Sequence, residues 1–217
     1  MSEEKHENLV ERDVPPIPFW RNSLIILVGP SGSGKSTFAK KHFPPTMTVS
    51  TDHCRAMVCD TPSNQKVSDD AFEIFYFILE KRMKNGYPAV ADSTALRKKY
   101  RQRLTDMASR YCFSTVLLFF DLPFDFCERN DQGRRFTVGE EVQKNQFRSI
   151  ENTRKEIEEE RYDRVVVLKT KEELDRFSYR WSSPLVERDF EGPLDIIGDV
   201  HGCRSEEHTS ELQSRQS

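Results

Sequence analysis

The segment that most constrains the fold of this chain is residues 29–36, which read GPSGSGKS and match the pattern G-x-x-x-x-G-K-[ST]. An apolar run at residues 24–28 precedes the segment, and a helix-forming stretch follows it. In a loop of this kind the glycines let backbone N–H groups converge on phosphate oxygens, and the following helix directs its positive dipole end at them. Strand, loop and helix in this order predict a nucleotide-binding P-loop, in which Lys35 bridges the β- and γ-phosphates of ATP and the Ser36 hydroxyl binds Mg²⁺.

Short apolar runs alternate with helical patterns along the rest of the chain. Strands that are apolar throughout, each followed by a helix, are typical of a parallel sheet covered on both faces. The sequence therefore predicts an α/β P-loop NTPase fold with a five-stranded parallel sheet. The predicted strands are residues 24–28, 47–51, 88–92, 114–121 and 164–168, and the helices after the one that follows the loop are residues 69–85, 97–110, 123–129 and 138–160.

Composition and charge say more about the compartment in which the protein works than about the reaction that it performs. The net charge of −3 argues against a globally basic nucleic-acid binder but allows a local basic groove. Five cysteines without a C-x-x-C pair suit a reducing compartment rather than a disulfide scaffold. Residues 1–13 lack an apolar signal-peptide core, and the longest apolar runs are too short to span a bilayer. We therefore expect a cytoplasmic protein with no membrane contact.

Two charged residues, Asp52 and Arg55, directly follow the second predicted strand. A carboxylate at the C-terminal edge of such a sheet faces the catalytic crevice. Asp52 is then placed to accept a proton from an attacking hydroxyl, and Arg55 to hold a substrate phosphate. The spacing equally allows Asp52 to be a helix N-cap and Arg55 to be an ordinary surface residue.

The third predicted strand also ends in a carboxylate, Asp92. It could hold the hydration shell of Mg²⁺, as a Walker-B carboxylate does, or cap the following helix, and its position favours the first reading. The predicted ATP and Mg²⁺ contacts are therefore Gly29, Pro30, Ser31, Gly32, Ser33, Gly34, Lys35, Ser36, Thr37 and Asp92.

Three arginines, Arg129, Arg134 and Arg135, lie in or beside a polar segment between two predicted helices. Phosphoryl transfer needs cations that neutralise the transferring group, and a lid over the phosphate loop can supply them. Composition alone favours an ordinary solvated loop, whereas the position after the fourth strand favours the functional reading.

A basic helix, residues 97–110, carries Arg97, Lys98, Lys99, Arg101 and Arg103 together with Tyr100. Such a basic surface could guide a polyanion. A solvated helix face is the more common meaning of this pattern, and we favour it.

Taken together, these motifs resemble the bacterial polynucleotide kinase-phosphatase family. The resemblance covers about residues 22–203 and rests on GPSGSGKSTFAKKHF, the STDHCR step, a strand that ends in Asp-x-Thr, the ERN-plus-arginine segment with a distal Val/Gln helix, and DIIGDVHGC near the end of the chain. It implies transfer of the γ-phosphate of ATP to a 5′-OH polynucleotide end, with RNA more probable than DNA as the acceptor. By motif, the catalytic residues would be Lys35, Asp52 as general base, Arg55 on the acceptor, and Arg129 with Arg134 or Arg135 on the donor phosphates.

The resemblance has two further consequences. Ala95 departs from the family pattern, in which Asn is common after Asp-x-Thr. The GDVHGC segment resembles the first motif of calcineurin-like metallophosphoesterases, so Asp199 and His201 would be ligands of a binuclear site for Mn²⁺ or a similar divalent pair. Two ligands do not complete such a site, and no phosphatase activity is expected. The family also implies RNA-repair partner proteins and a homodimer.

The expected organisation follows from these assignments. Residues 1–18 form a flexible arm, 19–170 the kinase domain, 171–193 a connector, and 194–203 the truncated start of a phosphatase domain. Residues 204–217 are expected to be non-native, because their core looks like a translated sequencing adapter. Two other functions stay open: a small-molecule or nucleoside kinase of the same sheet topology, and a non-catalytic ATP-binding switch.

Overall fold

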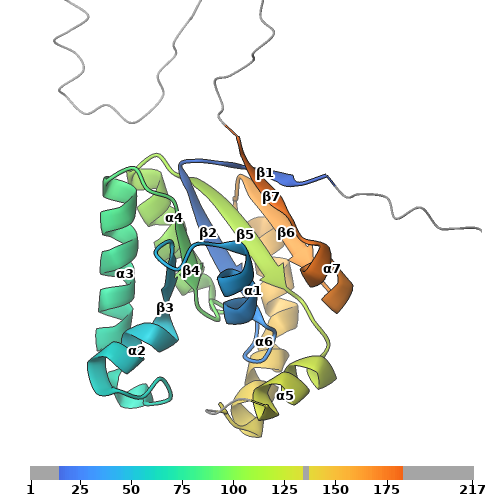
Figure 1. Cartoon of the computed structure of the whole chain (residues 1–217). Helices are drawn as coiled ribbons and strands as arrows, with labels where there is room; N and C mark the ends of the chain where they lie inside the picture. Colours follow the sequence, from blue (N-terminus) through green and yellow to red (C-terminus); the bar gives the residue numbers. More distant parts are fainter. Residues whose placement is uncertain (1–14, 134–136, 183–217) are drawn as a thin grey trace, which may run out of the picture.

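The computed structural model describes residues 15–133 and 137–182 of this chain. Its centre is a five-stranded sheet in the order β3-β4-β2-β5-β6, in which every neighbouring pair is parallel (Figure 1). This confirms the predicted fold class. The strands are β2 Ser23–Val28, β3 Thr48–Ser50, β4 Ala89–Asp92, β5 Ser114–Phe120 and β6 Arg164–Leu168.

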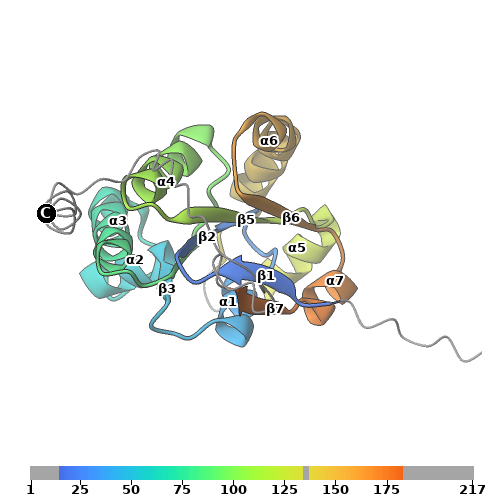
Figure 2. The same ribbon diagram turned by 90° about the horizontal axis from the view of Figure 1, so that it is seen from above.

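Helices connect the strands and cover both faces of the sheet. Helices α3, α4 and α6 lie on one face, and α1 and α7 lie on the other (Figure 2). The helices are α1 Lys35–His42, α2 Thr51–Cys59, the short 3-10 helix η1 Gln65–Val67, α3 Ser68–Lys84, α4 Lys98–Arg110, α5 Phe124–Gln132, α6 Glu140–Glu159 and α7 Lys171–Arg176. None of these described helices has both the length and the apolar character that crossing a membrane requires.

The alternation of side chains along β2 builds two hydrophobic cores. Every residue of β2 is buried. Leu24 and Ile26 belong to the core under α3, α4 and α6, whereas Ile25 and Leu27 belong to the core beside α1. Because successive side chains of a strand point to opposite faces, a continuous apolar strand needs cover on both.

A second, two-stranded sheet was not predicted. Strand β1 Ile17–Trp20 pairs in parallel with β7 Tyr179–Ser182, so described parts of the expected arm and connector are ordered elements. The ring of Phe19, which is 1% exposed, stacks on Tyr179 with centroids 5.2 Å apart. Each strand has four residues, β1 contains a proline, β7 alternates aromatic with polar residues, and their pairing joins the two ends of the described chain. No local pattern indicates such a contact.

Candidate functional site

The predicted phosphate loop connects β2 to α1 at the carboxyl edge of the sheet. Its glycines have positive φ angles, +152° at Gly29, +81° at Gly32 and +88° at Gly34. At Gly32 a Cβ atom would lie 2.0 Å from the carbonyl oxygen of Cys127 in α5. Glycine is therefore required there both by the backbone conformation and by the close approach of α5.

The side chain of Lys35 turns back into the loop that precedes it. Its Nζ donates to the carbonyl oxygens of Gly29 at 2.8 Å and Pro30 at 2.6 Å, and to Ser33 Oγ at 3.2 Å. Lys35 is 7% exposed. A buried ammonium held by the carbonyls of a glycine-rich loop at a helix N-terminus is a suitable partner for nucleotide phosphates.

Asp92 ends β4 beside this loop and is buried. Burial raises the pKa of Asp92 above its usual value, the charge of Lys35 and hydrogen bonds with Ser36 and Ser50 oppose this rise, and nearby Asp52 adds to it. Helix α4 has Arg97 as its N-cap, so Asp92 is not a capping residue. Among the described residues no group of three His, Cys, Asp or Glu side chains could hold a metal. One carboxylate beside a hydroxyl nevertheless fits Mg²⁺, which keeps waters and phosphates as its other ligands.

Asp52 lies in the first turn of α2, because β3 ends at Ser50 rather than at the predicted residue 51. The N-cap of α2 is Ser50, so the alternative reading of Asp52 as a cap is wrong. The side chain of Asp52 is 59% exposed, and its Oδ1 accepts a hydrogen bond from Arg55 Nη1 at 2.5 Å.

Arg55 is buried rather than at the surface. Besides Asp52, its Nη1 donates to the carbonyl oxygen of Pro62 at 2.9 Å, and its buried Nε has no hydrogen-bond partner among residues 15–133 and 137–182. A buried cation thus contacts an exposed carboxylate directly after the carboxyl end of β3, an arrangement that can hold an anionic group and accept a proton from a hydroxyl.

The structure does not bring Arg129 to the phosphate loop. Its exposed side chain donates from Nε to the carbonyl oxygen of Asp125 in its own helix, at 3.1 Å. The α5 side chain that reaches the loop is Asn130, whose Nδ2 donates to the carbonyl oxygen of Gly32 at 3.0 Å. The other predicted charged site residues, Arg134, Arg135, Asp199 and His201, lie outside the described residues.

Two glutamines of α6 also contact the loop and were not predicted individually. The backbone N–H of Ser31 donates to Gln146 Oε1 at 2.7 Å. Gln143, 2% exposed, donates from Nε2 to the carbonyl oxygens of Cys127 at 3.2 Å and Ser31 at 3.4 Å. Their spacing of three residues on one helix was the available signal, because such residues share a face.

Ala95, the departure from the family pattern, has a φ angle of +44°. Asn adopts a left-handed conformation more readily than Ala does, which gives a backbone reason for Asn at this position. In this chain the Ala95 carbonyl oxygen accepts a hydrogen bond from Arg101 Nη1 at 2.9 Å.

The sequence matches the model of the AAA domain family over residues 24–157, more than half of the chain. The chain belongs to the AAA domain family. The match spans the phosphate loop, the main sheet except Ser23 and β6, and nearly all of α6. With the parallel sheet order, it identifies this AAA domain as a P-loop kinase-like α/β domain.

Solved structures with similar folds include several kinases. A proposed kinase from Chloroflexus aurantiacus is 16% identical with a TM-score of 0.49, and the match covers 69% of this chain and 89% of that chain. A gluconokinase from Sinorhizobium meliloti is 20% identical with a TM-score of 0.47, covering 73% and 89%. A chain of a Pnkp1/Rnl/Hen1 complex is 22% identical with a TM-score of 0.45, covering 60% and 43%. The comparison with curated proteins finds no significant match.

Proposed function

We propose that this AAA domain is an ATP-dependent phosphotransferase that phosphorylates the 5′-hydroxyl ends of polynucleotides. The observation that carries the proposal is the Asp52–Arg55 pair, in which an exposed carboxylate is oriented by a buried guanidinium. Asp52 is close enough to Asp92 to raise the pKa of that carboxyl group. The proposed proton acceptor, Asp52, is therefore near the residues that would hold ATP and its metal.

Each side chain has a part in the proposed reaction. Lys35 would contact the β- and γ-phosphates, and Ser36 and Asp92 would hold Mg²⁺, which when bound neutralises phosphate charge. Asp52 would accept the proton of the acceptor hydroxyl as that oxygen bonds to the γ-phosphorus. The bond between the γ-phosphorus and the β–γ bridging oxygen then breaks, and ADP leaves.

The polynucleotide acceptor is proposed from the order of motifs in the sequence. Asp52-x-x-Arg55 follows the phosphate loop, and the metallophosphoesterase-like Asp199-x-His201 follows the kinase-like domain. Arg129 with Arg134 or Arg135 would bind the donor phosphates, which for Arg129 requires its side chain to leave Asp125. The same proposal includes RNA as the acceptor, RNA-repair proteins as partners, a homodimer and a cytoplasmic location. Asp199 and His201 would bind Mn²⁺ or a similar divalent ion.

Phosphate transfer from labelled ATP tests the proposal. The acceptors are 5′-OH RNA, 5′-OH DNA, nucleosides and 3′-phosphonucleotides, and RNA should be labelled best. Asp52→Asn should lower transfer about 100-fold or more while ATP still binds, because general-base catalysis contributes about 10²–10⁴. Lys35→Ala should lose ATP binding as well.

The matched control is Asp69→Asn, the same change in the first turn of α3. It should leave transfer unchanged. Label on nucleosides or 3′-phosphonucleotides alone would replace this proposal with a small-molecule kinase. ATP binding without label on any acceptor would indicate a switch module.

A further inference from the structure

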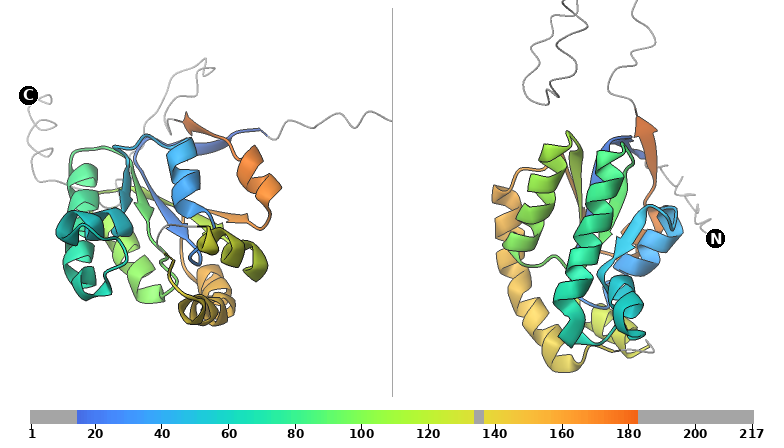
Figure 3. Two further views of the ribbon diagram at one scale, coloured as in Figure 1. Left: turned by 60° about the horizontal axis from the view of Figure 1, so that its bottom comes forward. Right: turned by 90° about the vertical axis from the view of Figure 1, so that its left-hand side faces the viewer.

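Helix α6 contacts two separate parts of the candidate site along one face. Its N-terminal half reaches the phosphate loop through Gln143 and Gln146. Its C-terminal half reaches the segment that follows β4 directly through Thr153, and its C-cap, Glu160, reaches it through Arg101 of α4. The first of these parts is the loop that would bind phosphate, and the second is the segment just after Asp92, residues 94–96. Figure 3 shows α6 as one long helix that runs along the side of the domain.

At the phosphate loop, side chains of α6 contact both the backbone N–H and the backbone carbonyl of Ser31. Gln146 accepts the Ser31 N–H, and Gln143 approaches the Ser31 carbonyl at 3.4 Å. Gln143 is almost fully buried and also binds the carbonyl oxygen of Cys127. The peptide groups on both sides of Ser31 are therefore set by side chains of α6 and not by the loop alone.

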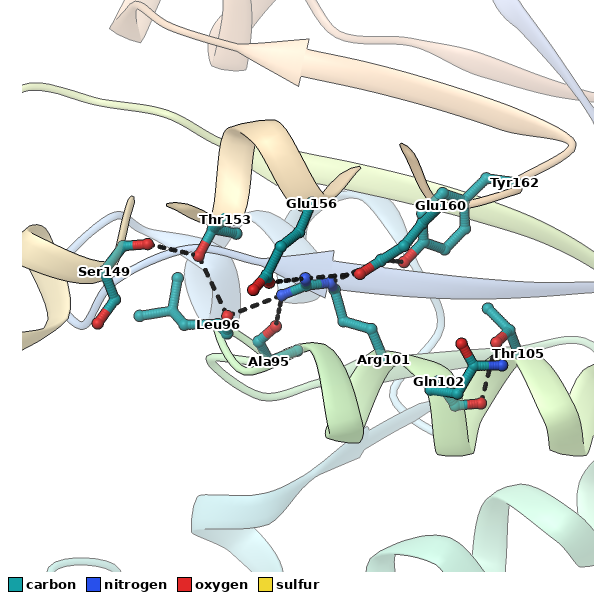
Figure 4. A network of polar contacts seen from close by, with 10 residues as sticks. All are labelled: Ala95, Leu96, Arg101, Gln102, Thr105, Ser149, Thr153, Glu156, Glu160 and Tyr162. Carbon is teal, nitrogen blue, oxygen red and sulfur yellow. Dashed lines mark hydrogen bonds and ion pairs between the residues drawn. The ribbon is translucent and has the colours of Figure 1, made fainter. Parts of the chain in front are cut away.

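At the other end, a fully buried arginine joins α6 to the segment after β4 (Figure 4). Arg101 is 0% exposed, and its Nη1 donates to the carbonyl oxygens of Ala95 at 2.9 Å and Leu96 at 2.8 Å. Its Nη2 donates to Glu156 at 2.6 Å and Glu160 at 2.8 Å. Because a buried guanidinium needs its carboxylates, Ala95 and Leu96 cannot shift without disturbing α6.

Two further contacts connect α6 to the phosphate loop through the segment after β4: one from a side chain of α6 and one between backbone groups. The Thr153 hydroxyl in α6 lies 3.1 Å from the carbonyl oxygen of Leu96 and 2.8 Å from that of Ser149 in its own helix, so its one proton is shared between the two acceptors. One residue before Ala95, the carbonyl oxygen of Thr94 accepts the N–H of Gly29, the first residue of the phosphate loop, at 3.0 Å. The segment after β4 therefore holds the start of the loop while α6 holds its middle.

We propose that α6 is the positioning element of the phosphate loop, with Gln146 and Thr153 as positioning residues for ATP binding. Gln146 keeps the Ser31 amide oriented, and Thr153 keeps the Leu96 segment in register with Gly29. The inference rests on the ATP-binding part of the proposed function and is independent of the acceptor. Loss of either contact should weaken ATP binding without unfolding the domain.

The test measures the Kd for ATP·Mg²⁺ by equilibrium titration, together with Tm, in the full chain. Gln146→Met has nearly the same volume but lacks the acceptor oxygen, and it should weaken ATP binding about 3- to 10-fold, the effect of one hydrogen bond. Gln102→Met is the matched control, because the exposed Gln102 side chain contacts Asp106 in its own helix. Its Kd should match that of the wild type.

Thr153→Val and Thr153→Ser form a second matched pair. Val keeps the branched shape and loses the hydroxyl, so ATP binding should weaken about 2- to 5-fold. Ser keeps the hydroxyl and should bind ATP as the wild type does. Equal ATP binding by Gln146→Met would overturn the inference, and so would tighter binding, which would mean that the glutamine competes with phosphate. Equal Kd values for the two Thr153 variants would overturn the role of Thr153. A wild-type chain that does not bind ATP at all would instead reject the proposed function.

Discussion

Arg101 in α4 and Glu160 at the end of α6 form a two-pronged ion pair. Arg101 Nε donates to Glu160 Oε2 at 2.9 Å, and Nη2 donates to Glu160 Oε1 at 2.8 Å. Burial alone would raise the pKa of Glu160, but hydrogen bonds from Arg101 and Tyr162 hold it below its usual value. The sequence placed Arg101 on a solvated basic face, and this is wrong for that residue: its guanidinium is enclosed by acceptors from α6 and from the segment after β4.

Removing this guanidinium should strongly destabilise the domain. Arg101→Met leaves Glu156 and Glu160 without their buried partner, which should lower the free energy of unfolding by about 3–5 kcal/mol. The control is Arg110→Met at the other end of α4, where the exposed side chain is 3.9 Å from Glu80. That change should be within about 1 kcal/mol of wild type. Urea denaturation compares the two, and equal losses would contradict a structural role for the Arg101 pair.

The contact between the phosphate loop and α5 leaves no room for a side chain at Gly32. Gly32→Ala should abolish ATP binding or prevent folding, because its Cβ would overlap the Cys127 carbonyl group. At Gly86 the φ angle is +75°, and apart from its chain neighbours no described residue has an atom within 4 Å of an added Cβ. Gly86→Ala should therefore cost only about 1–2 kcal/mol of backbone strain. Thermal unfolding and ATP titration of both variants measure the difference, and similar behaviour would show that the loop can move away from α5.

His42, near the end of α1, should make stability depend on pH. Its ring packs on Phe38 and Phe177, and burial, helped by the charge of Lys41, lowers its pKa despite opposing contributions from Leu174 and Asp175. Because the pKa of His42 is lowered in the folded chain, the unfolded chain binds the proton at a higher pH than the folded chain does. The contribution of neutral His42 is thus complete above pH of about 6.5 and is lost as pH falls toward the folded pKa.

The measurement is the Tm between pH 7.5 and 5.5 for the wild type and His42→Gln, which does not titrate in that range. The wild type should lose more stability on acidification than the variant does. Parallel curves for the two proteins would show that the depressed pKa of His42 has no role in stability.

Asp60 should be a site for stabilisation. It is the exposed C-cap of α2 with a φ angle of +58°, where it combines a left-handed conformation with a negative charge at the negative end of the helix. Asp60→Gly should raise the free energy of unfolding by about 0.5–1 kcal/mol, because glycine adopts this conformation without strain. Asp60→Asn should give part of the gain by removing the charge. Chemical denaturation measures both, and a loss of stability in the Gly variant would contradict this account.

The fold could be predicted largely because its signals are local. The run before the loop, residues 24–28, became the buried central strand β2, and residues 164–168 became β6 with the same bounds. Most helix ends shifted by one or two residues, as at Ser68 and Glu140, whereas α5 extends to Gln132, three residues beyond the predicted end, and α2 was not predicted. The small β1–β7 sheet was missed because its strands are short and its packing depends on aromatic rings distant in sequence.

The amino-acid sequence by itself determined that this chain has a phosphate loop between a strand and a helix, since that pattern depends on glycine conformations and on contiguous residues. It did not decide whether Asp52 is a helix cap or whether Arg55 is a surface residue, and it favoured a solvated face for Arg101. The structure shows that Ser50 caps α2 and that both arginines are buried. Burial needs the tertiary structure, because the residues that cover a side chain come from elements that are far apart in the chain, as α6 does for Arg101. The same holds for Gln143 and Gln146, whose side-chain amides contact the phosphate loop only because α6 packs against it.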